Sequence, residues 1–440
     1  MSFTSIEFIL FLPAVFLVYW ALGRWQRWQN LFLLVASYVF YAWWDWRFLG
    51  LIAFSSLMAW GCALAMGRLP DGGACRWVNI ANIAVNIGIL AVFKYYNFFA
   101  DSLGLTTARI VLPIGISFYT FQAIGYSVDV YKRRIEPTTD LVAFLTFMAF
   151  FPKVVSGPIE RGNTLLPQLL KPRSFDYSRA VDGMRQMLWG FFKKLIIADS
   201  CAAIVDAVWA DYSAYSSLGL LVACVLFSFQ VYCDLSGYTD IALGAARLLG
   251  IELSRNFNLP YFAQNIPEFW RRWHMSLMQW FRDYIYFPMG GSRCPRWRTA
   301  VNTITVFLIS GLWHGADWSF ITYGLYHGLL CSSFLLMKWE SRVITFTLVT
   351  LGRILFRADN LSQAGGYFGH LASFSTGMTA GLWLLPLCAA LLVVEWVQRD
   401  KSHVLQIGGH RVVRWVLYLV LTLIIIFGRQ GSHDFIYYQF

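Results

Sequence analysis

Residues 212–233, YSAYSSLGLLVACVLFSFQVYC, contain no charged side chain and are long enough to cross a bilayer as one helix. Apolar runs of similar character recur along the whole chain of 440 residues. Hydrophobic residues make up 58% of the sequence, aromatic residues 18% and charged residues only 13%. This composition excludes a disordered chain, a coiled coil and an ordinary cytosolic enzyme, and it predicts a polytopic membrane protein.

Apolar runs elsewhere in the chain predict the remaining membrane crossings. They cover 3–23, 28–44, 48–67, 77–93, 110–128, 299–316, 318–337, 343–356, 377–394 and 415–428. With a weaker candidate at 187–210, the total is about twelve crossings of roughly 20 residues each. The run 141–151 is too short to cross and is followed by prolines and a glycine, which favours a re-entrant or interfacial element. The expected fold class is therefore all-α and polytopic.

Basic residues alternate between loops and give the chain an orientation. Arg24 and Arg27 follow the first apolar run, and the triplet 132–134 (KRR) follows the fifth. Because basic loops face the cytoplasm, the N-terminus is expected outside, and an even number of crossings places the C-terminus there too.

The charge balance indicates the kind of partner. Lys and Arg number 35 against 24 Asp and Glu, a formal net charge of +11. The basic residues lie in short clusters between apolar runs, so they indicate membrane lipids at a cytoplasmic rim and a phosphate-bearing cofactor rather than nucleic acid. The eight cysteines form no CxxC pair and mostly lie in apolar runs, which indicates buried thiols. No phosphate-binding loop, HExxH or GxSxG motif occurs, and no metal site is expected.

Polar residues also occur within the predicted spans. Asn79, Asn82 and Asn86 are spaced to share one helix face, which indicates hydrogen bonding between helices. The segment 232–240 places two carboxylates and several hydroxyls at the end of a span. It indicates either the wall of a wet cavity or a structural hydrogen-bond network.

Two histidines lie among apolar residues. Between Pro267 and Pro288, aromatic residues recur at helical spacing and predict an amphipathic interfacial helix, with His274 on its apolar side. His314 lies near the end of the 299–316 run, at membrane depth. An imidazole there has the pKa range for proton transfer near neutral pH, and a structural role is the alternative for both residues.

Six stretches, taken in chain order, carry a resemblance to a known family. They are PIGISFYTFQAIGYSVDVYK (113–132), FFPKVVSGPIERGNTLLPQL (150–169), YCDLSGYTDIALGAARLLGI (232–251), FWRRWHMSL (269–277), WFRDYIYFPMGG (280–291) and SGLWHGADW (310–318). Together they resemble the membrane-bound O-acyltransferase family, in its bacterial alginate O-acetyltransferase branch. The resemblance implies helices around a central tunnel, with His314 at the essential histidine position and His274 at the second, supporting position.

The resemblance also implies a reaction, in which an acyl group passes from a cytoplasmic thioester donor, acetyl-CoA, to a hydroxyl reached from outside. Such a transfer needs a general base, for which His314 is expected, and a donor that stabilises the oxyanion. Arginines near the histidine motifs are expected to attract the phosphates of coenzyme A, or to serve only as topology signals. These residues are Arg271, Arg272, Arg293, Arg296 and Arg298.

The chain ends in FIYYQF (435–440), an aromatic segment typical of an interfacial anchor. It resembles an FxYxxF ending of this branch, in which the tyrosine is proposed to carry or present the acyl group. Tyr437 is therefore a candidate catalytic relay that needs an adjacent base such as His314, with anchoring or docking as the alternative. The resemblance further implies a partner with the SGNH, serine-esterase-like triad that this chain lacks, and a polysaccharide acceptor.

The expected protein is a single membrane domain, residues 1–440, in a bacterial inner membrane. Its segments are 1–110 with the first spans, 111–337 with the histidine motifs, 338–428 with the last spans, and the extracytoplasmic tail 429–440. Acetylation of an alginate-like polysaccharide is the favoured activity. Peptidoglycan or cellulose acetylation and D-alanyl transfer stay open, and a solute transporter or channel is the alternative of a different class.

Overall fold

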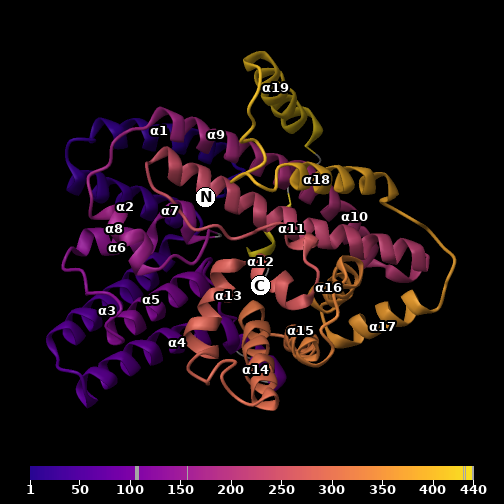
Figure 1. Cartoon of the computed structure of the whole chain (residues 1–440), viewed down its shortest axis with the longest axis horizontal. Helices are drawn as coiled ribbons and strands as arrows, with labels where there is room; N and C mark the ends of the chain where they lie inside the picture. The colour runs from indigo at the N-terminus through magenta and orange to yellow at the C-terminus, as the bar shows by residue number, and fades with distance from the viewer. Residues whose placement is uncertain (105–108, 156, 430, 432, 439–440) are drawn as a thin grey trace. The chain divides into compact units, whose positions relative to one another are not determined.

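The computed structural model describes residues 1–104, 109–155, 157–429, 431 and 433–438. Within this part of the chain every regular element is a helix and no strand occurs, which confirms the all-α class (Figure 1). The chain divides into two compact units, Met1–Met187 with Ile241–Ser254 and Leu188–Asp240 with Arg255–Phe440. The single domain and its four segments stay a prediction.

The helices are distributed over both units. The first unit contains α1 (Ile6–Ala21), α2 (Gln26–Ala42), η1 (Trp46–Phe48), α3 (Leu49–Arg68), α4 (Gly73–Ser102), α5 (Ile116–Tyr131), α6 (Leu141–Ala149), α7 (Phe151–Val154) and α8 (Gly162–Leu169). Two of the three unit boundaries fall within α9 (Tyr177–Phe192) and α11 (Ser217–Leu248), and the third lies between Ser254 and Arg255. The second unit contains η2 (Lys193–Ala198), α10 (Asp199–Ala210), η3 (Tyr212–Ala214), η4 (Pro260–Phe262), α12 (Ile266–Arg272), α13 (Met275–Phe281), η5 (Arg282–Tyr286), α14 (Arg296–His314), α15 (Trp318–Met337), α16 (Arg342–Arg357), α17 (Leu361–Ala372), η6 (Leu382–Leu384), α18 (Leu385–Val397), α19 (Arg411–Gly428) and η7 (Ile436–Tyr438).

Of the helices described, five are long and apolar enough to cross a membrane. They are the segment Trp46–Arg68 that contains α3, and α4, α11, α15 and α19. This finding confirms a membrane protein with several apolar helices. Some predicted spans are shorter helices, such as α16 with 16 residues, so the total of about twelve crossings of roughly 20 residues stays a prediction.

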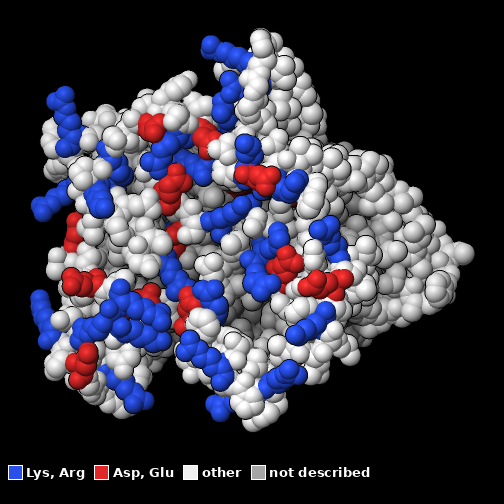
Figure 2. Space-filling view, viewed as in Figure 1, with Lys and Arg blue, Asp and Glu red and all other residues white. Residues whose placement is uncertain are grey.

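The surface of the second unit includes areas suited to lipid. Figure 2 shows a broad area without charged side chains over α10 and α11. On α19, Val416, Leu419 and Phe427 are all exposed, the last at 81%. Contiguous apolar surface of this kind is unfavourable in water, so we expect it to face the bilayer.

The asparagine face of α4 is buried in the first unit and joins it to two neighbouring helices. Ser55 Oγ on α3 donates to Asn86 Oδ1 at 2.5 Å, and Ser127 Oγ on α5 donates to Asn79 Oδ1 at 2.8 Å. Asn86 Nδ2 also donates to the main-chain oxygen of Asn82 at 2.9 Å. The predicted hydrogen bonding between helices is confirmed.

In the second unit, α14 and α15 pack closely against each other (Figure 1). A methyl group at Gly311 would collide with the main-chain oxygen of Phe320, and one at Gly324 would collide with that of Phe307. Glycine therefore lets the two backbones approach closely. This seam fixes the last turn of α14, where His314 lies.

The prediction of one continuous amphipathic helix between Pro267 and Pro288 is wrong. Helix α12 ends at Arg272, α13 begins at Met275, and the π-helix η5 follows. His274 lies at the break with φ 44° and ψ 52°, in the left-handed region that residues other than glycine seldom adopt. The aromatic spacing did not reveal the break because both halves keep a helical period.

Candidate functional site

The break before α13 is held by Asn256. The N–H of Met275 donates to the main-chain oxygen of Asn256 at 2.8 Å, and the N–H of Ser276 donates to its Oδ1 at 3.1 Å. His274 itself is only 3% exposed, and its ring centroid lies 6.2 Å from that of Trp313. The unusual backbone therefore brings the imidazole against the end of α14.

His274 is held in its neutral form. It lies between two helices of seven residues each, which are too short to span a membrane. Burial lowers the pKa of His274 to about 4, because loss of water disfavours the charged imidazolium. At neutral pH the side chain therefore offers one N–H donor and one nitrogen acceptor.

His314 is the last residue of α14 and is 5% exposed. Its ring centroid lies 5.0 Å from that of Trp313, 5.4 Å from Phe356 and 6.3 Å from Tyr323. The imidazole is thus enclosed by aromatic rings. In such a low-dielectric environment, electrostatic interactions with a reacting group are stronger than in water.

The C-terminal tail reaches this aromatic enclosure. Tyr437 Oη lies 3.3 Å from Nδ1 of His314, and the two rings are stacked with centroids 6.0 Å apart. The ring of Tyr437 also lies 6.3 Å from that of His274. The structure therefore brings the three predicted catalytic residues together, while their chemical roles stay a prediction.

A buried cluster of charges, which we call the tail clamp, holds the tail in place. It consists of Lys194, Asp199 and Asp234, and the lysine Nζ lies 2.8 Å from a carboxylate oxygen of each aspartate. Lys194 Nζ donates to the main-chain oxygen of His433 at 3.0 Å, and the N–H of Ile436 donates to Asp234 Oδ2 at 2.7 Å. The clamp therefore binds the tail through its backbone, up to the residue before the tyrosine.

The segment 232–240 takes part in this network. Asp240 Oδ2 lies 2.7 Å from Lys193 Nζ, and the ring of Tyr238 packs on that of Phe435 with centroids 4.2 Å apart. These contacts agree with the structural network, one of the two alternatives that the sequence left open. They also extend it, because one of its ring partners belongs to the tail.

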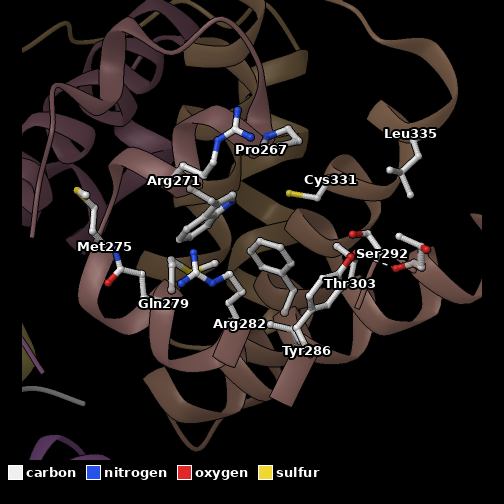
Figure 3. Close-up of a pocket in the computed structure, with 15 residues that line it drawn as sticks. Pro267, Arg271, Met275, Gln279, Arg282, Tyr286, Ser292, Thr303, Cys331 and Leu335 are labelled. Carbon is white, nitrogen blue, oxygen red and sulfur yellow. Dashed lines mark hydrogen bonds between the residues drawn. The ribbon is translucent and has the colours of Figure 1, made fainter. Parts of the chain in front are cut away.

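A cavity of about 510 Å³ lies among α12, α13, α14 and α15 (Figure 3). Arg271, Gln279 and Arg282 lie on one side of it, with Cys331 and Leu335 on the other. Most of its remaining lining is apolar or aromatic. A cavity of this size, mainly apolar with a few polar groups, is typical of a small-molecule site, and two guanidinium groups suit a phosphate.

The five arginines predicted to bind the donor have different surroundings. Arg271 lines the cavity, whereas Arg272 pairs with Glu268 on its own helix at 2.7 Å. The other three are exposed around the start of α14: Arg293, Arg296 and Arg298. Contact of any of them with a donor stays a prediction.

Two features of the site were not predicted as functional. Arg282 lines the cavity beside Arg271, and the tail clamp holds the tail. A signal for the clamp exists in the sequence, since Lys194 and Asp199 interrupt an apolar run at a cost that only a buried partner offsets. No comparable signal distinguishes Arg282 from the other arginines near it.

The eight cysteines are free thiols, six of them buried, as expected from their apolar surroundings. In the described part of the chain, no group of three or more His, Cys, Asp or Glu residues is placed to hold a metal ion.

Comparison with known proteins places this site in a family. The model of the membrane-bound O-acyltransferase family matches residues 38–348, which include both histidines. A probable alginate O-acetylase of Pseudomonas aeruginosa is 38% identical over 401 aligned residues, covering 86% of this chain and 76% of the relative. A peptidoglycan O-acetyltransferase of Helicobacter pylori is 29% identical over 514, covering 99% and 97%. A teichoic acid D-alanyltransferase of Bacillus subtilis is 31% identical over 269, covering 55% and 68%.

These matches define the class of the protein as an O-acyltransferase with several apolar helices. The chain belongs to the membrane-bound O-acyltransferase family. The resemblance of its six sequence stretches is thereby confirmed.

Proposed function

We propose that the protein transfers acetyl groups from cytoplasmic acetyl-CoA across a bacterial inner membrane for O-acetylation of an extracytoplasmic, alginate-like polysaccharide. One observation carries the proposal: a phenol, Tyr437 Oη, lies 3.3 Å from an imidazole nitrogen, Nδ1 of His314, in an enclosed aromatic site. A hydroxyl and a base at this distance are the pair that nucleophilic acyl transfer requires. Relatives named as probable alginate O-acetylases support the choice of acceptor.

The first step makes an ester on the tail. His314 Nδ1 accepts the phenol proton while Tyr437 Oη attacks the carbonyl carbon of the thioester. The new C–O bond forms, the C–S bond breaks, and the departing thiolate takes the proton from the imidazolium. Burial raises the pKa of the Tyr437 phenol, so it stays protonated until the base acts.

The second step passes the acetyl group on. An acceptor hydroxyl, on a partner protein or on the polysaccharide, loses its proton to His314 and attacks the ester carbonyl of acetylated Tyr437. The phenol is released and takes the proton back. His274, neutral and with its ring centroid 6.3 Å from that of Tyr437, is assigned to orient and polarise the reacting groups rather than to exchange protons.

The donor is proposed to enter at the cavity described above. Its lining carries Arg271 and Arg282 at positions suited to the phosphates of coenzyme A, and an apolar interior suited to the pantetheine arm. Arg293, Arg296 and Arg298, exposed near the start of α14, add positive charge that attracts such an anion. Arg272 and Arg282 each pair with a carboxylate, but only Arg282 lines the cavity, so Arg272 is left the role of a topology signal.

The remaining parts of the proposal concern the membrane. We assign the chain about twelve crossings of roughly 20 residues each around a central tunnel, with both termini outside. The acetyl group then leaves through Tyr437 to an SGNH, serine-esterase-like partner, which completes transfer to the polysaccharide. Peptidoglycan or cellulose acetylation and D-alanyl transfer are alternatives that use the same residues.

Intact-protein mass spectrometry after incubation with acetyl-CoA tests this function. We expect a mass increase of about 42 Da, one acetyl group, in the wild type and in the neighbouring control Tyr438→Phe. Tyr437→Phe and His314→Ala should remain folded and show no increase. An adduct that persists in Tyr437→Phe would contradict the role of Tyr437 as the acetyl relay. Acetyl transfer that persists in His314→Ala would contradict the role of His314 as the general base.

A panel of acceptors then separates the substrate classes. Purified protein with its partner is offered acetyl-CoA together with alginate, cellulose or peptidoglycan fragments, and release of free coenzyme A is followed. Faster release of coenzyme A in the presence of alginate would support the proposal. Acceleration by another polymer alone would move the assignment to that polymer, and solute flux in proteoliposomes without any acyl transfer would favour the transporter.

A further inference from the structure

Arg353 on α16 is a buried cation with few partners. Its side chain is only 2% exposed, and Nη1 donates to the hydroxyl of Tyr323 at 3.4 Å. Its Nε and Nη2 atoms have no hydrogen-bond partner among the described residues, and within those residues it makes no ion pair. By contrast, the buried Lys194 of the tail clamp is balanced by two carboxylates.

The surroundings of Arg353 are the aromatic enclosure of the site. Its guanidinium carbon lies 4.4 Å from the ring centroid of Trp273, the residue before His274, and 5.8 Å from that of Phe356. Phe356 and Tyr323 are also the rings that pack against His314. The charge therefore lies among the aromatic rings that enclose His314 and beside the residue that precedes His274.

A charge in this place is costly for the fold. Aromatic faces attract a cation only weakly compared with a carboxylate, and two of the three guanidinium nitrogens gain no hydrogen bond. Buried charges without a counter-ion occur where function requires them. We therefore expect the positive charge of Arg353 to be balanced by a negative charge that develops on the substrate during the reaction.

We propose that Arg353 provides the oxyanion stabilisation of the acyl-transfer reaction, its Nε–H and Nη2–H binding the carbonyl oxygen that becomes negative. This proposal rests on the proposed function. As Tyr437 Oη bonds to the thioester carbon, the C=O π electrons move onto the oxygen, and the resulting oxyanion takes hydrogen bonds from Arg353. When the C=O bond re-forms, the C–S bond breaks, and the thiolate is protonated by the imidazolium of His314. A guanidinium aimed at this oxygen stabilises the transition state more than the uncharged ground state.

The electrostatics of the phenol agree with this placement. Burial raises the pKa of Tyr437, and the positive charge of Arg353 opposes that rise. The same charge thus favours both the phenolate that attacks and the oxyanion that follows.

The test compares Arg353→Gln, Arg353→Lys and the wild type in rapid-quench acetylation of Tyr437 by acetyl-CoA. Arg342→Gln is the matched control, because it removes an exposed arginine from the same helix. For Arg353→Gln we expect the rate at saturating donor to fall about 100-fold or more, with the half-saturating donor concentration unchanged. Arg353→Lys, which keeps the charge, should recover part of the rate, and Arg342→Gln should match the wild type.

Thermal unfolding in detergent separates this role from a structural one. Removing a buried charge that has no counter-ion should leave the melting temperature of Arg353→Gln equal to or above that of the wild type. A variant that loses both rate and fold would contradict the proposal, as would Arg353→Gln acting at the wild-type rate or Arg353→Lys recovering nothing.

Failure of the oxyanion role of Arg353 can be distinguished from failure of the relay role of Tyr437. If the wild type carries no acetyl group on Tyr437, the relay fails, and Arg353 is then tested on release of free coenzyme A with the polysaccharide present. Any attacking hydroxyl forms the same oxyanion, so the same loss is expected there. If the acetyl adduct on Tyr437 forms in Arg353→Gln at the wild-type rate, the oxyanion proposal is overturned and the relay is not.

Discussion

The asparagine face of α4 and the tail clamp bury polar groups among helices in two different ways. On α4, neutral amides exchange hydrogen bonds with hydroxyls of neighbouring helices, as Asn86 does with Ser55. In the clamp, Lys194 pairs with Asp199 and Asp234, and Lys194 and Asp234 also bind the main chain of the tail.

The two networks differ in how many hydrogen-bonding groups remain available to bind another segment of the chain. Neutral amides are satisfied by one or two partners and serve to join helices. A buried ion cluster is costly unless its charges are paired with opposite charges, and its members have enough donors and acceptors to bind a further segment. The charged groups are therefore buried at the place where the tail is held beside His314.

The largest expected effect comes from breaking the clamp with Lys194→Met. This change leaves two buried carboxylates facing each other without a cation, and we expect a loss of about 3–5 kcal/mol of folding stability. Acetylation of Tyr437 should be lost as well, because the tail is no longer held. Thermal unfolding in detergent and the mass assay measure the two effects; a fully stable variant would show that the clamp is not a buried ion cluster.

The triple variant Lys194→Met, Asp199→Asn, Asp234→Asn separates stability from tail binding. With all three charges removed together, stability should largely return, because no charge is left without a partner. The tail should stay released, which hydrogen exchange at the amide of Ile436 detects as faster exchange. Protection of that amide at the wild-type level would show that the clamp does not hold the tail.

A smaller effect is expected from Asn86→Ala on α4. The change removes the acceptor of the Ser55 hydroxyl and should cost about 1 kcal/mol, the usual scale for hydrogen bonds between membrane helices. Acetylation per folded molecule should be unchanged, because this network binds no part of the site. A loss of activity without a loss of melting temperature would mean that the asparagine face has a further role.

The smallest effect is expected at the surface, with Asp45→Asn. Hydrogen bonds from the Arg47 side chain hold the pKa of the Asp45 carboxyl below its usual range, so the folded state favours the ionised form. Its contribution is present above the pKa of an unfolded aspartate and is lost as the pH falls through the folded value. The small difference in melting temperature from wild type at pH 7 should therefore vanish in acid, and a difference that grows in acid would contradict this sign.

Part of this architecture could be predicted from the sequence because it is local. The spacing of Asn79, Asn82 and Asn86 fixes their common face on any helix, and the structure buries that face. The position of His314 at the end of a long apolar helix follows from the run that precedes it. The two histidine motifs are among the six stretches that carry the family resemblance, and the comparisons confirm that resemblance.

Other parts depend on contacts between distant residues. Tyr437 and His314 are 123 residues apart, and only tertiary packing brings them to 3.3 Å. The left-handed conformation of His274 is held by hydrogen bonds from the next two residues to Asn256. The helical spacing of the aromatic residues gives no indication of these bonds. Arg353 lies within a predicted span, and a charged residue in a span indicates a functional role. Its lack of a carboxylate partner among the described residues, however, is visible only in the folded chain.

The tail clamp binds the main chain of the tail, and this attachment has a consequence for turnover. Under the proposed function, the nucleophile is part of the same chain as the base, so its effective concentration at the site does not depend on how dilute the protein is. Each molecule can then store one acetyl group and no more, and donor consumption halts after one equivalent until an acceptor empties the tyrosine. The tail would act as a one-place buffer that keeps the acetyl-CoA pool from draining when no polysaccharide is being made.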